Sequence, residues 1–275
     1  MAQFVSRSHL SNFEGGRRDL TPAIREAYER AGVPMPGKAK DMTSSDALEA
    51  HYDFLQSARR LDDKMGSFAV LSIGKGQTDL AESLVKEAPK GRVLEIASQW
   101  AIFTGWLEIA TGQPNAARST LTKAEQWGEG DDLLRRVAIG FDAYRLEQTG
   151  KTGDALHRLE FAQRIPFLHP AQRAYDVIRQ ARLNVAIGQR RRARQLLDTV
   201  PRLIDAVDGE GPPPDCVYWH SRGFLEIQEA RVLGELGEGS DAAQLIRASL
   251  AQLPMEQQVA EWAQKYYDEA TSWEA

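Results

Sequence analysis

Residues 105–124 read GWLEIATGQPNAARSTLTKA, and the same outline recurs as AYRLEQTGKTGDALHRLEFA at 143–162 and as ARLNVAIGQRRRARQLLDTV at 181–200. Each copy has a glycine at the same place, with small or aliphatic residues at four fixed places around it. In the first copy these residues are Gly105, Gly112, Ala117, Leu121 and Ala124, and a fourth copy follows around Gly237. Self-similarity at a fixed period of this length is typical of stacked helix–turn–helix units.

The small residues of this pattern suit helices that pack closely on one another. A bulky side chain at such a position would hold two helices apart, so these sites stay small. Gly112, Gly150 and Gly188 each follow a segment with a helical signature. No part of the sequence has the sustained apolar alternation that predicts strands. We therefore expect an all-α fold made of antiparallel helix pairs.

The bulk properties are those of a water-soluble protein. The chain has 275 residues, a net charge of −5 and one cysteine, Cys216, so an internal disulfide is excluded. No signal-peptide pattern follows Met1, and the most apolar stretch, residues 100–110, is too short and too polar to span a membrane. Residues 1–40 contain seven Lys and Arg but only four acidic residues, which makes that segment basic. We expect a cytoplasmic protein without a membrane partner, and the basic end is weak support for a polyanionic one.

Residues 5–22, which read VSRSHLSNFEGGRRDLTP, resemble the recognition helix and following turn of phage-repressor-like (XRE-family) transcription regulators. The family pattern often reads VSxSxLSxIExGxRxPTP. The resemblance implies that four side chains face DNA base edges in the major groove, namely Arg7, Ser8, Ser11 and Asn12. It also implies that two side chains, Arg17 and Arg18, lie near phosphates, which position a protein without reading sequence.

The family places two further helices before the recognition helix, whereas this sequence begins with Met1-Ala2-Gln3-Phe4. The resemblance therefore implies a partial helix-turn-helix at residues 1–37. Three explanations stay open at this point. The start codon is assigned too far downstream, the domain is a degenerate remnant, or the helix pair has been reused for another purpose.

The four glycine-centred copies resemble the tetratricopeptide consensus, although the tryptophan and proline positions of that family are mostly absent. The resemblance implies a right-handed superhelix of antiparallel helix pairs at residues 46–275, joined by a linker at 38–45. Within it we expect a helical hairpin at 45–89 with a break at Gly74-Lys75-Gly76 and a stiff loop at 205–215. We expect one capping helix at 255–273, because Val259, Trp262, Tyr266 and Ala270 follow one another at helical spacing.

No motif in the sequence predicts catalysis, a cofactor or a metal site. Gly150-Lys151-Thr152 lacks the first glycine and the preceding strand of a phosphate-binding loop. Cys216 and His220 provide two metal-ligating side chains, whereas a structural zinc site needs four. The arginines at 190–192 and 194 are interpreted as a solvated turn between repeats.

In tetratricopeptide arrays the first helix of each repeat lines an inner groove. Counting from the small residue before each glycine gives the positions expected to face that groove, which are Gln99, Ile102, Trp106, Tyr144, Tyr175, Ile178, Arg182, Phe224, Ile227 and Arg231. We expect this face to bind an extended or helical peptide, with Arg182 and Arg231 holding an acidic group. The alternative is that several of these side chains only pack between helices.

Together the two resemblances imply a DNA-binding transcription regulator whose repeat domain senses a signalling peptide or another ligand and forms a homodimer. DNA is then a partner if the helix-turn-helix is complete in the native protein. The alternative is a stand-alone tetratricopeptide adaptor that binds a protein or peptide and never touches DNA.

Overall fold

The computed structural model describes residues 42–166 and 169–274, and every regular element within them is helical. The chain divides into two compact units, residues 1–50 and 51–275, and the fold described below is that of the second unit. The predicted helix-turn-helix at 1–37 lies outside the described residues, as does the linker up to residue 41. Its DNA-contacting residues, Arg7, Ser8, Ser11, Asn12, Arg17 and Arg18, therefore have no described position.

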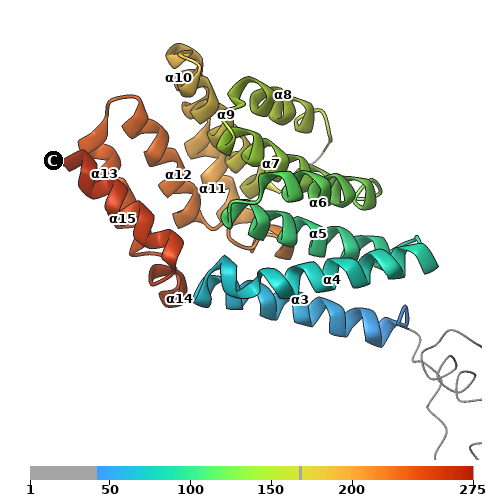
Figure 1. Cartoon of the computed structure of the whole chain (residues 1–275). Helices are drawn as coiled ribbons and strands as arrows, with labels where there is room; N and C mark the ends of the chain where they lie inside the picture. Colours follow the sequence, from blue (N-terminus) through green and yellow to red (C-terminus); the bar gives the residue numbers. More distant parts are fainter. Residues whose placement is uncertain (1–41, 167–168, 275) are drawn as a thin grey trace, which may run out of the picture. The chain divides into compact units, whose positions relative to one another are not determined.

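The helices follow one another with short connections and are labelled in Figure 1. They are α3 (Ser45–Met65), α4 (Ser67–Glu87), α5 (Arg92–Ala110), α6 (Pro114–Trp127), α7 (Asp132–Gln148), α8 (Thr152–Ala162), α9 (Pro170–Ala186), α10 (Arg190–Leu197), α11 (Val200–Glu210), the 3₁₀-helix η1 (Asp215–Val217), α12 (Arg222–Glu235), α13 (Gly239–Leu250), α14 (Met255–Gln258) and α15 (Glu261–Glu274).

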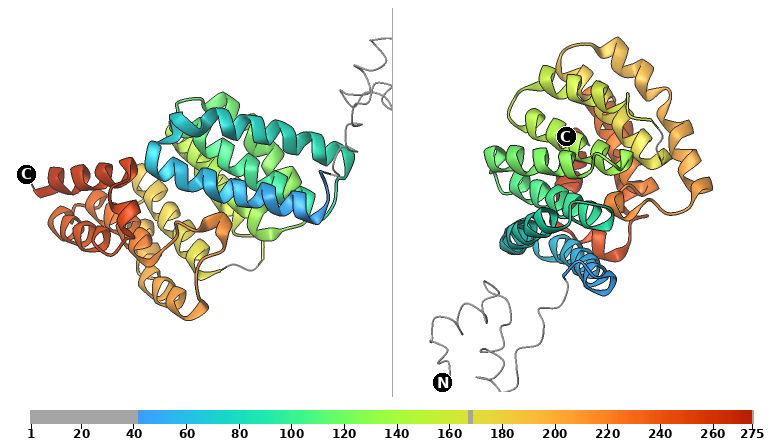
Figure 2. Two further views of the ribbon diagram at one scale, coloured as in Figure 1. Left: turned by 90° about the horizontal axis from the view of Figure 1, so that it is seen from below. Right: turned by 90° about the vertical axis from the view of Figure 1, so that its right-hand side faces the viewer.

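From α4 to α9, each helix packs on the next one along the chain. The pairs α5–α6, α7–α8, α9–α10 and α12–α13 stack in chain order, which Figure 2 shows from two directions. The first helices of neighbouring pairs also contact each other, α5 with α7 and α9 with α12. An ion pair of 2.7 Å between Arg136 and Asp176 links α7 to α9, so contacts join all four first helices, which position the site described below.

The repeated glycine ends the first helix of all four pairs in the same way. Gly112, Gly150, Gly188 and Gly237 have φ angles of 75°, 74°, 79° and 94°, in the left-handed region that favours glycine. The residue after each glycine donates its N–H to the carbonyl five residues earlier, as in the contact from Gln113 to Glu108 at 2.7 Å. This pattern is the Schellman motif, which satisfies carbonyls left unpaired at a helix end. The predicted turns are confirmed.

The small and aliphatic residues of the pattern form the interior between paired helices. Ala117, Ala155, Ala193 and Ala242 are completely buried on the second helices. On the first helix α5, a Cβ added to Gly105 would lie 2.6 Å from Leu121 Cδ2, so only glycine fits without repacking. Close helix packing at these positions, predicted from the sequence, is therefore confirmed.

Four local expectations are wrong. Helix α4 continues through Gly74-Lys75-Gly76, because Gly74 provides a close approach to α5, where an added Cβ would lie 2.9 Å from Thr104 Oγ1. Much of the predicted loop at 205–215 is helix α11, since Val200, Ile204 and Val207 are spaced to bury one helical face. The irregular part begins at Gly211.

The third error concerns the end of the chain. The single helix expected at 255–273 is divided into α14 and α15, and Val259 at the break is 79% exposed. No glycine or proline marks this break in the sequence.

The fourth error concerns the arginines at 190–192 and 194. We expected them in a turn, but they lie in helix α10.

Candidate ligand-binding site

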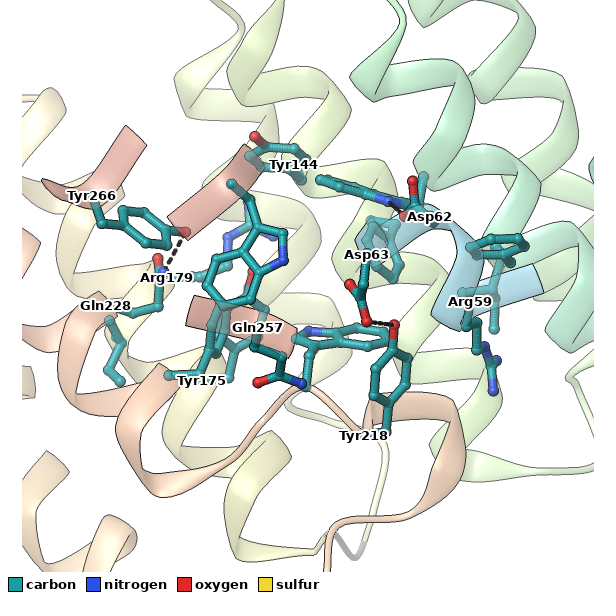
Figure 3. A pocket seen from close by; sticks show the side chains of 18 of the residues that line it. Arg59, Asp62, Asp63, Tyr144, Tyr175, Arg179, Tyr218, Gln228, Gln257 and Tyr266 are labelled. Atoms are coloured by element: carbon teal, nitrogen blue, oxygen red, sulfur yellow. Dashed lines mark hydrogen bonds between the residues drawn. The ribbon is translucent and has the colours of Figure 1, made fainter. Parts of the chain in front are cut away.

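A cavity of about 160 Å³ opens within the second unit, lined by side chains of helices from α3 to α15. Most of the lining comes from the first helices of the pairs, and most of the lining side chains are aromatic or arginine (Figure 3). The lining residues are Arg59, Asp62, Asp63, Ile102, Phe103, Trp106, Phe141, Tyr144, Tyr175, Ile178, Arg179, Arg182, Tyr218, Trp219, Phe224, Gln228, Arg231, Gln257, Trp262 and Tyr266.

Most of the residues predicted to face a groove line this one cavity. They are Ile102, Trp106, Tyr144, Tyr175, Ile178, Arg182, Phe224 and Arg231. Two predicted residues do not line it. Gln99 is buried and accepts a hydrogen bond from Arg59 Nη2 at 3.3 Å, and Ile227 is completely buried in the core between α12, α13 and α15. These two side chains pack between helices and do not face the cavity.

Four lining residues were not predicted from the sequence, although the repeat pattern contains a signal for them. Phe103, Phe141, Arg179 and Gln228 stand two residues before the small residue of each copy, so one more repeat position would have included them. A second group comes from outside the repeats, namely Arg59, Asp62, Asp63, Tyr218, Trp219, Gln257, Trp262 and Tyr266. Only the folded arrangement brings that second group to the cavity.

At one end, which we name the arginine end, Arg179, Arg182 and Arg231 each form an ion pair with a glutamate. Arg179 Nη2 lies 2.8 Å from Glu147 Oε2, and Arg182 Nε lies 3.0 Å from Glu235 Oε1. Arg182 Nη1 also lies 3.4 Å from Glu147 Oε1, and Arg231 Nε lies 2.7 Å from Glu269 Oε2. Three positive charges are thus matched by three glutamates.

The same arginines also lie over tyrosine rings. The guanidinium carbon of Arg179 is 5.3 Å from the centre of the Tyr144 ring and 5.9 Å from that of Tyr175. The guanidinium carbon of Arg231 is 5.1 Å from the centre of the Tyr266 ring. These distances are within the range of cation–π interactions. Burial is the main reason why the pKa of Tyr175 is raised to about 12.

At the other end, which we name the acidic end, Asp62 and Asp63 of α3 accept hydrogen bonds from side chains of other segments. Trp106 Nε1 donates to Asp62 Oδ2 at 2.9 Å, and Ser67 Oγ donates to Asp62 Oδ1 at 2.8 Å. The Tyr218 hydroxyl donates to Asp63 Oδ2 at 3.3 Å. Figure 3 shows Asp62, Asp63 and Tyr218 across the cavity from Arg179, Gln228 and Tyr266.

A continuous run of aromatic rings joins the two ends. Ring-centre distances are 6.2 Å from Trp106 to Tyr144, 6.1 Å from Trp106 to Phe141, and 5.7 Å from Phe141 to Trp219. Trp219 in turn meets Tyr218 edge-on at 5.2 Å. Such pairs are favourable beyond the area that they bury, and they form an apolar wall between the two polar ends.

His220 lies behind this wall. Its ring is 4.3 Å from that of Tyr175, and neither of its nitrogen atoms has a hydrogen-bond partner among the described residues. Burial lowers the pKa of His220 to about 3, so the imidazole is neutral at physiological pH. Burial likewise raises the pKa of the nearby Cys216 thiol to about 12, which disfavours the reactive thiolate form.

Other possible sites in the described residues give less support for a function. No three His, Cys, Asp or Glu side chains gather there as metal ligands, and no helix there is long and apolar enough to cross a membrane. The arginines of α10 contact the neighbouring pair, where Arg190 donates to the Leu236 carbonyl and Arg194 pairs with Glu238. Comparison with protein-family models, curated proteins and solved structures found no significant match.

Proposed function

We propose that this chain is a ligand-responsive transcription regulator, in which residues 1–37 read DNA and the helical pairs sense a peptide or small ligand. The observation that carries the proposal is a cavity lined together by α3, by four successive first helices and by α15. Binding sites are typically concave and apolar, with a few placed polar groups, and this cavity has that composition.

The repeat geometry supports the tetratricopeptide-like part of the proposal. The four pairs share one helix-ending turn, with glycine at positive φ in Gly112, Gly150, Gly188 and Gly237. They also share a completely buried alanine five residues later. A right-handed superhelix of such pairs presents the first helices on its inner face, which agrees with the helices that line the cavity.

A possible path from ligand to DNA runs through α3. This helix begins at Ser45, directly after the N-terminal segment, and contributes Arg59, Asp62 and Asp63 to the cavity wall. A ligand that contacts these side chains favours one arrangement of α3 over another. Such differential binding to two arrangements is the physical basis of a ligand-controlled switch.

DNA binding by the chain tests the regulator proposal directly. Mobility shift is measured with DNA from upstream of the chain's own gene, at low and high salt, with and without a stabilising ligand. A regulator should prefer one sequence and lose affinity steeply as salt increases, because it releases counterions from phosphates. Replacing Arg17 and Arg18 with Ala should weaken binding to all sequences and reduce the salt dependence.

The alternative function, an adaptor that binds a protein or peptide without DNA, rests on the same cavity, since all its lining residues lie between Arg59 and Tyr266. The mobility-shift experiment separates the two functions. If neither this chain nor a version extended by the preceding codons binds DNA, the regulator proposal fails and the adaptor is favoured. Dimerisation belongs to the regulator proposal, and light scattering at several concentrations measures it.

A further inference from the structure

We infer that the cavity binds an uncharged molecule that consists of about one aromatic ring with a carbonyl group attached. This inference deepens the proposed function, because it rests on the cavity being the sensing site and adds the chemical class of the ligand. Three features of the lining support it. They are its aromatic rings, the partners that the protein gives to its arginines, and a set of neutral polar groups that are not used within the protein.

Half of the residues that line the cavity are aromatic. Besides the run of rings from Trp106 to Trp219, a second series of rings extends through α9, α12 and α15. Ring-centre distances are 5.9 Å from Tyr175 to Phe224 and 6.0 Å from Phe224 to Trp262. A ligand ring can pack on such rings in an offset stack or edge-on, and each pair is favourable beyond the area that it buries. The lining therefore favours an aromatic ligand.

The arginine end is unfavourable for the acidic group that the sequence predicts at Arg182 and Arg231. Both guanidinium groups already pair with carboxylates of the protein, Glu235 at 3.0 Å and Glu269 at 2.7 Å. A ligand carboxylate would have to compete with these two groups of its own charge for the same donors. Because like charges placed together oppose binding, this end discriminates against anions.

A cationic ligand would meet charges of its own sign as well. Charges of both signs line the cavity, since four arginines lie in the same wall as Asp62 and Asp63. Among the arginines, Arg59 and Arg179 also donate to backbone carbonyls, at 2.9 Å and 2.8 Å. Moving a charge of either sign out of water is costly unless it gains a partner, and a neutral group needs only a hydrogen bond. The cavity therefore favours a ligand without a net charge.

Five neutral polar groups of the lining form no hydrogen bond with another described residue. They are the hydroxyl groups of Tyr144 and Tyr175, the indole N–H groups of Trp219 and Trp262, and the side-chain amide of Gln257. All five can donate a hydrogen bond, and an indole N–H can only donate. Because burial raises the pKa of Tyr175 to about 12, its hydroxyl keeps its proton at physiological pH. These donors match a neutral acceptor on the ligand, such as a carbonyl oxygen.

The size of the cavity limits what can be buried in it. Its volume is about 160 Å³. An engineered apolar cavity of about 150 Å³ holds one benzene molecule. The buried part of the ligand is therefore about one aromatic ring with a short polar substituent.

Thermal unfolding of the whole chain with matched probes tests the inference. Phenylpropanamide, phenylpropanoate and phenylpropylamine share a ring and a short spacer, and they are neutral, anionic and cationic. At about ten times its dissociation constant, phenylpropanamide should raise the melting temperature by about 3–5 °C, and the two charged probes at the same concentration should raise it by less than half as much. An equal or larger shift with either charged probe, or no shift with any of the three, overturns the inference.

Substitutions identify the donor to the carbonyl group. Tyr175→Phe, Trp219→Phe and Trp262→Phe each remove one donor and keep an aromatic ring. At least one of them should raise the dissociation constant of phenylpropanamide about 2- to 10-fold, because a neutral hydrogen bond is lost. Isothermal titration calorimetry measures it. Tyr267→Phe is the matched control, since Tyr267 lies on α15 outside the lining and should keep the constant of the parent chain.

Circular dichroism and melting without ligand check that each variant folds. An unchanged dissociation constant in every folded variant of the three overturns the inference. The comparison of the neutral and charged probes uses the parent chain, so it decides the charge of the ligand even where a variant does not fold.

One further probe identifies the source of the ligand. N-acetylphenylalanine amide carries the same ring between two neutral peptide groups, as in the interior of a peptide. A larger melting shift with it than with phenylpropanamide supports an uncharged peptide segment, and a smaller one supports a small molecule. Preference for free phenylalanine, which is charged at both ends, contradicts the inference. These results are independent of DNA binding, so the regulator proposal can fail while the inference stands, and the reverse.

Discussion

At one end of the cavity Arg179, Arg182 and Arg231 meet Glu147, Glu235 and Glu269, whereas at the other Asp62 and Asp63 accept hydrogen bonds from Trp106 and Tyr218. The arginine end is neutralised by the protein itself, and its arginines also lie over the protein's own tyrosine rings. At the acidic end, aromatic side chains donate hydrogen bonds to both aspartates. The two ends of the cavity thus use different interactions to fix their charged side chains, ion pairs at the arginine end and hydrogen bonds from aromatic donors at the acidic end.

The largest expected effect is loss of stability when the arginine end loses a glutamate. Glu147→Gln leaves the buried Arg179 without its ion-pair partner and also removes a carboxylate from Arg182. Breaking a buried pair from one side is strongly destabilising, so the free energy of unfolding should fall by about 2–4 kcal/mol. Urea unfolding measures it. The exposed Glu160 of α8 gives the control, Glu160→Gln, with a change within about 0.5 kcal/mol. An equally small change for Glu147→Gln would contradict the structural role of this end.

The next effect concerns His220, which packs against the wall that joins the two ends. Because burial lowers its pKa from 6.5 to about 3, the unfolded chain binds this proton more readily than the folded one. The contribution of the neutral His220 ring to the free energy of unfolding is complete above pH 6.5 and is lost as the pH falls toward 3. Between pH 7 and pH 5 the loss should be about 2 kcal/mol.

His220→Phe should remove that part of the acid sensitivity while keeping an aromatic ring against Tyr175. Urea unfolding from pH 5 to pH 8 measures the difference between the variant and the parent chain. His157→Gln, at an exposed position of α8, controls for the removal of a histidine. The same pH dependence in all three proteins would show that His220 is charged or solvated in the folded state.

Glu229 sharpens the comparison, because it lies on α12 with Arg231 but has no ion pair among the described contacts. Burial, followed by the charge of Glu226, raises its pKa from 4.5 to about 7. A carboxyl with a raised pKa favours folding below pH 4.5 and loses that contribution as the pH rises through 7. Glu229→Gln should therefore increase stability at pH 8 by about 1 kcal/mol, allowing for its partial exposure, and give no gain at pH 5. A loss of stability at pH 8 would indicate that the Glu229 charge is neutralised.

The smallest stability effect is expected at the acidic end. In Asp63→Asn, the amide oxygen can still accept the hydrogen bond from the Tyr218 hydroxyl. The free energy of unfolding should change by less than about 1 kcal/mol. A change as large as that of Glu147→Gln would remove the contrast between the two ends.

The sequence predicted the repeat geometry well, because it depends on local rules. Glycine after a helix and alanine inside a helix pair each have a steric cause that one repeat displays by itself, and Gly112 and Ala117 obey it. Eight cavity residues followed from that register, including Trp106 and Arg182. Gln99 and Ile227 have the same spacing but do not line the cavity. Gln99 accepts a hydrogen bond from Arg59, and Ile227 packs in the core around α13.

The acidic end could not be predicted from the sequence. Asp62 and Asp63 belong to the helix before the repeats, and Tyr218 follows a 3₁₀-helix far along the chain. No repeat position relates these residues, and only the packed array brings Tyr218 within hydrogen-bond distance of Asp63. The ion pairs of the arginine end could not be predicted either, because Glu147, Glu235 and Glu269 lie on three different helices.

The most direct test of the structural role of the arginine end is urea unfolding of Glu147→Gln beside the control Glu160→Gln. The account predicts a loss of about 2–4 kcal/mol in the free energy of unfolding for Glu147→Gln and a change within about 0.5 kcal/mol for Glu160→Gln. Equal changes in the two variants would contradict the account.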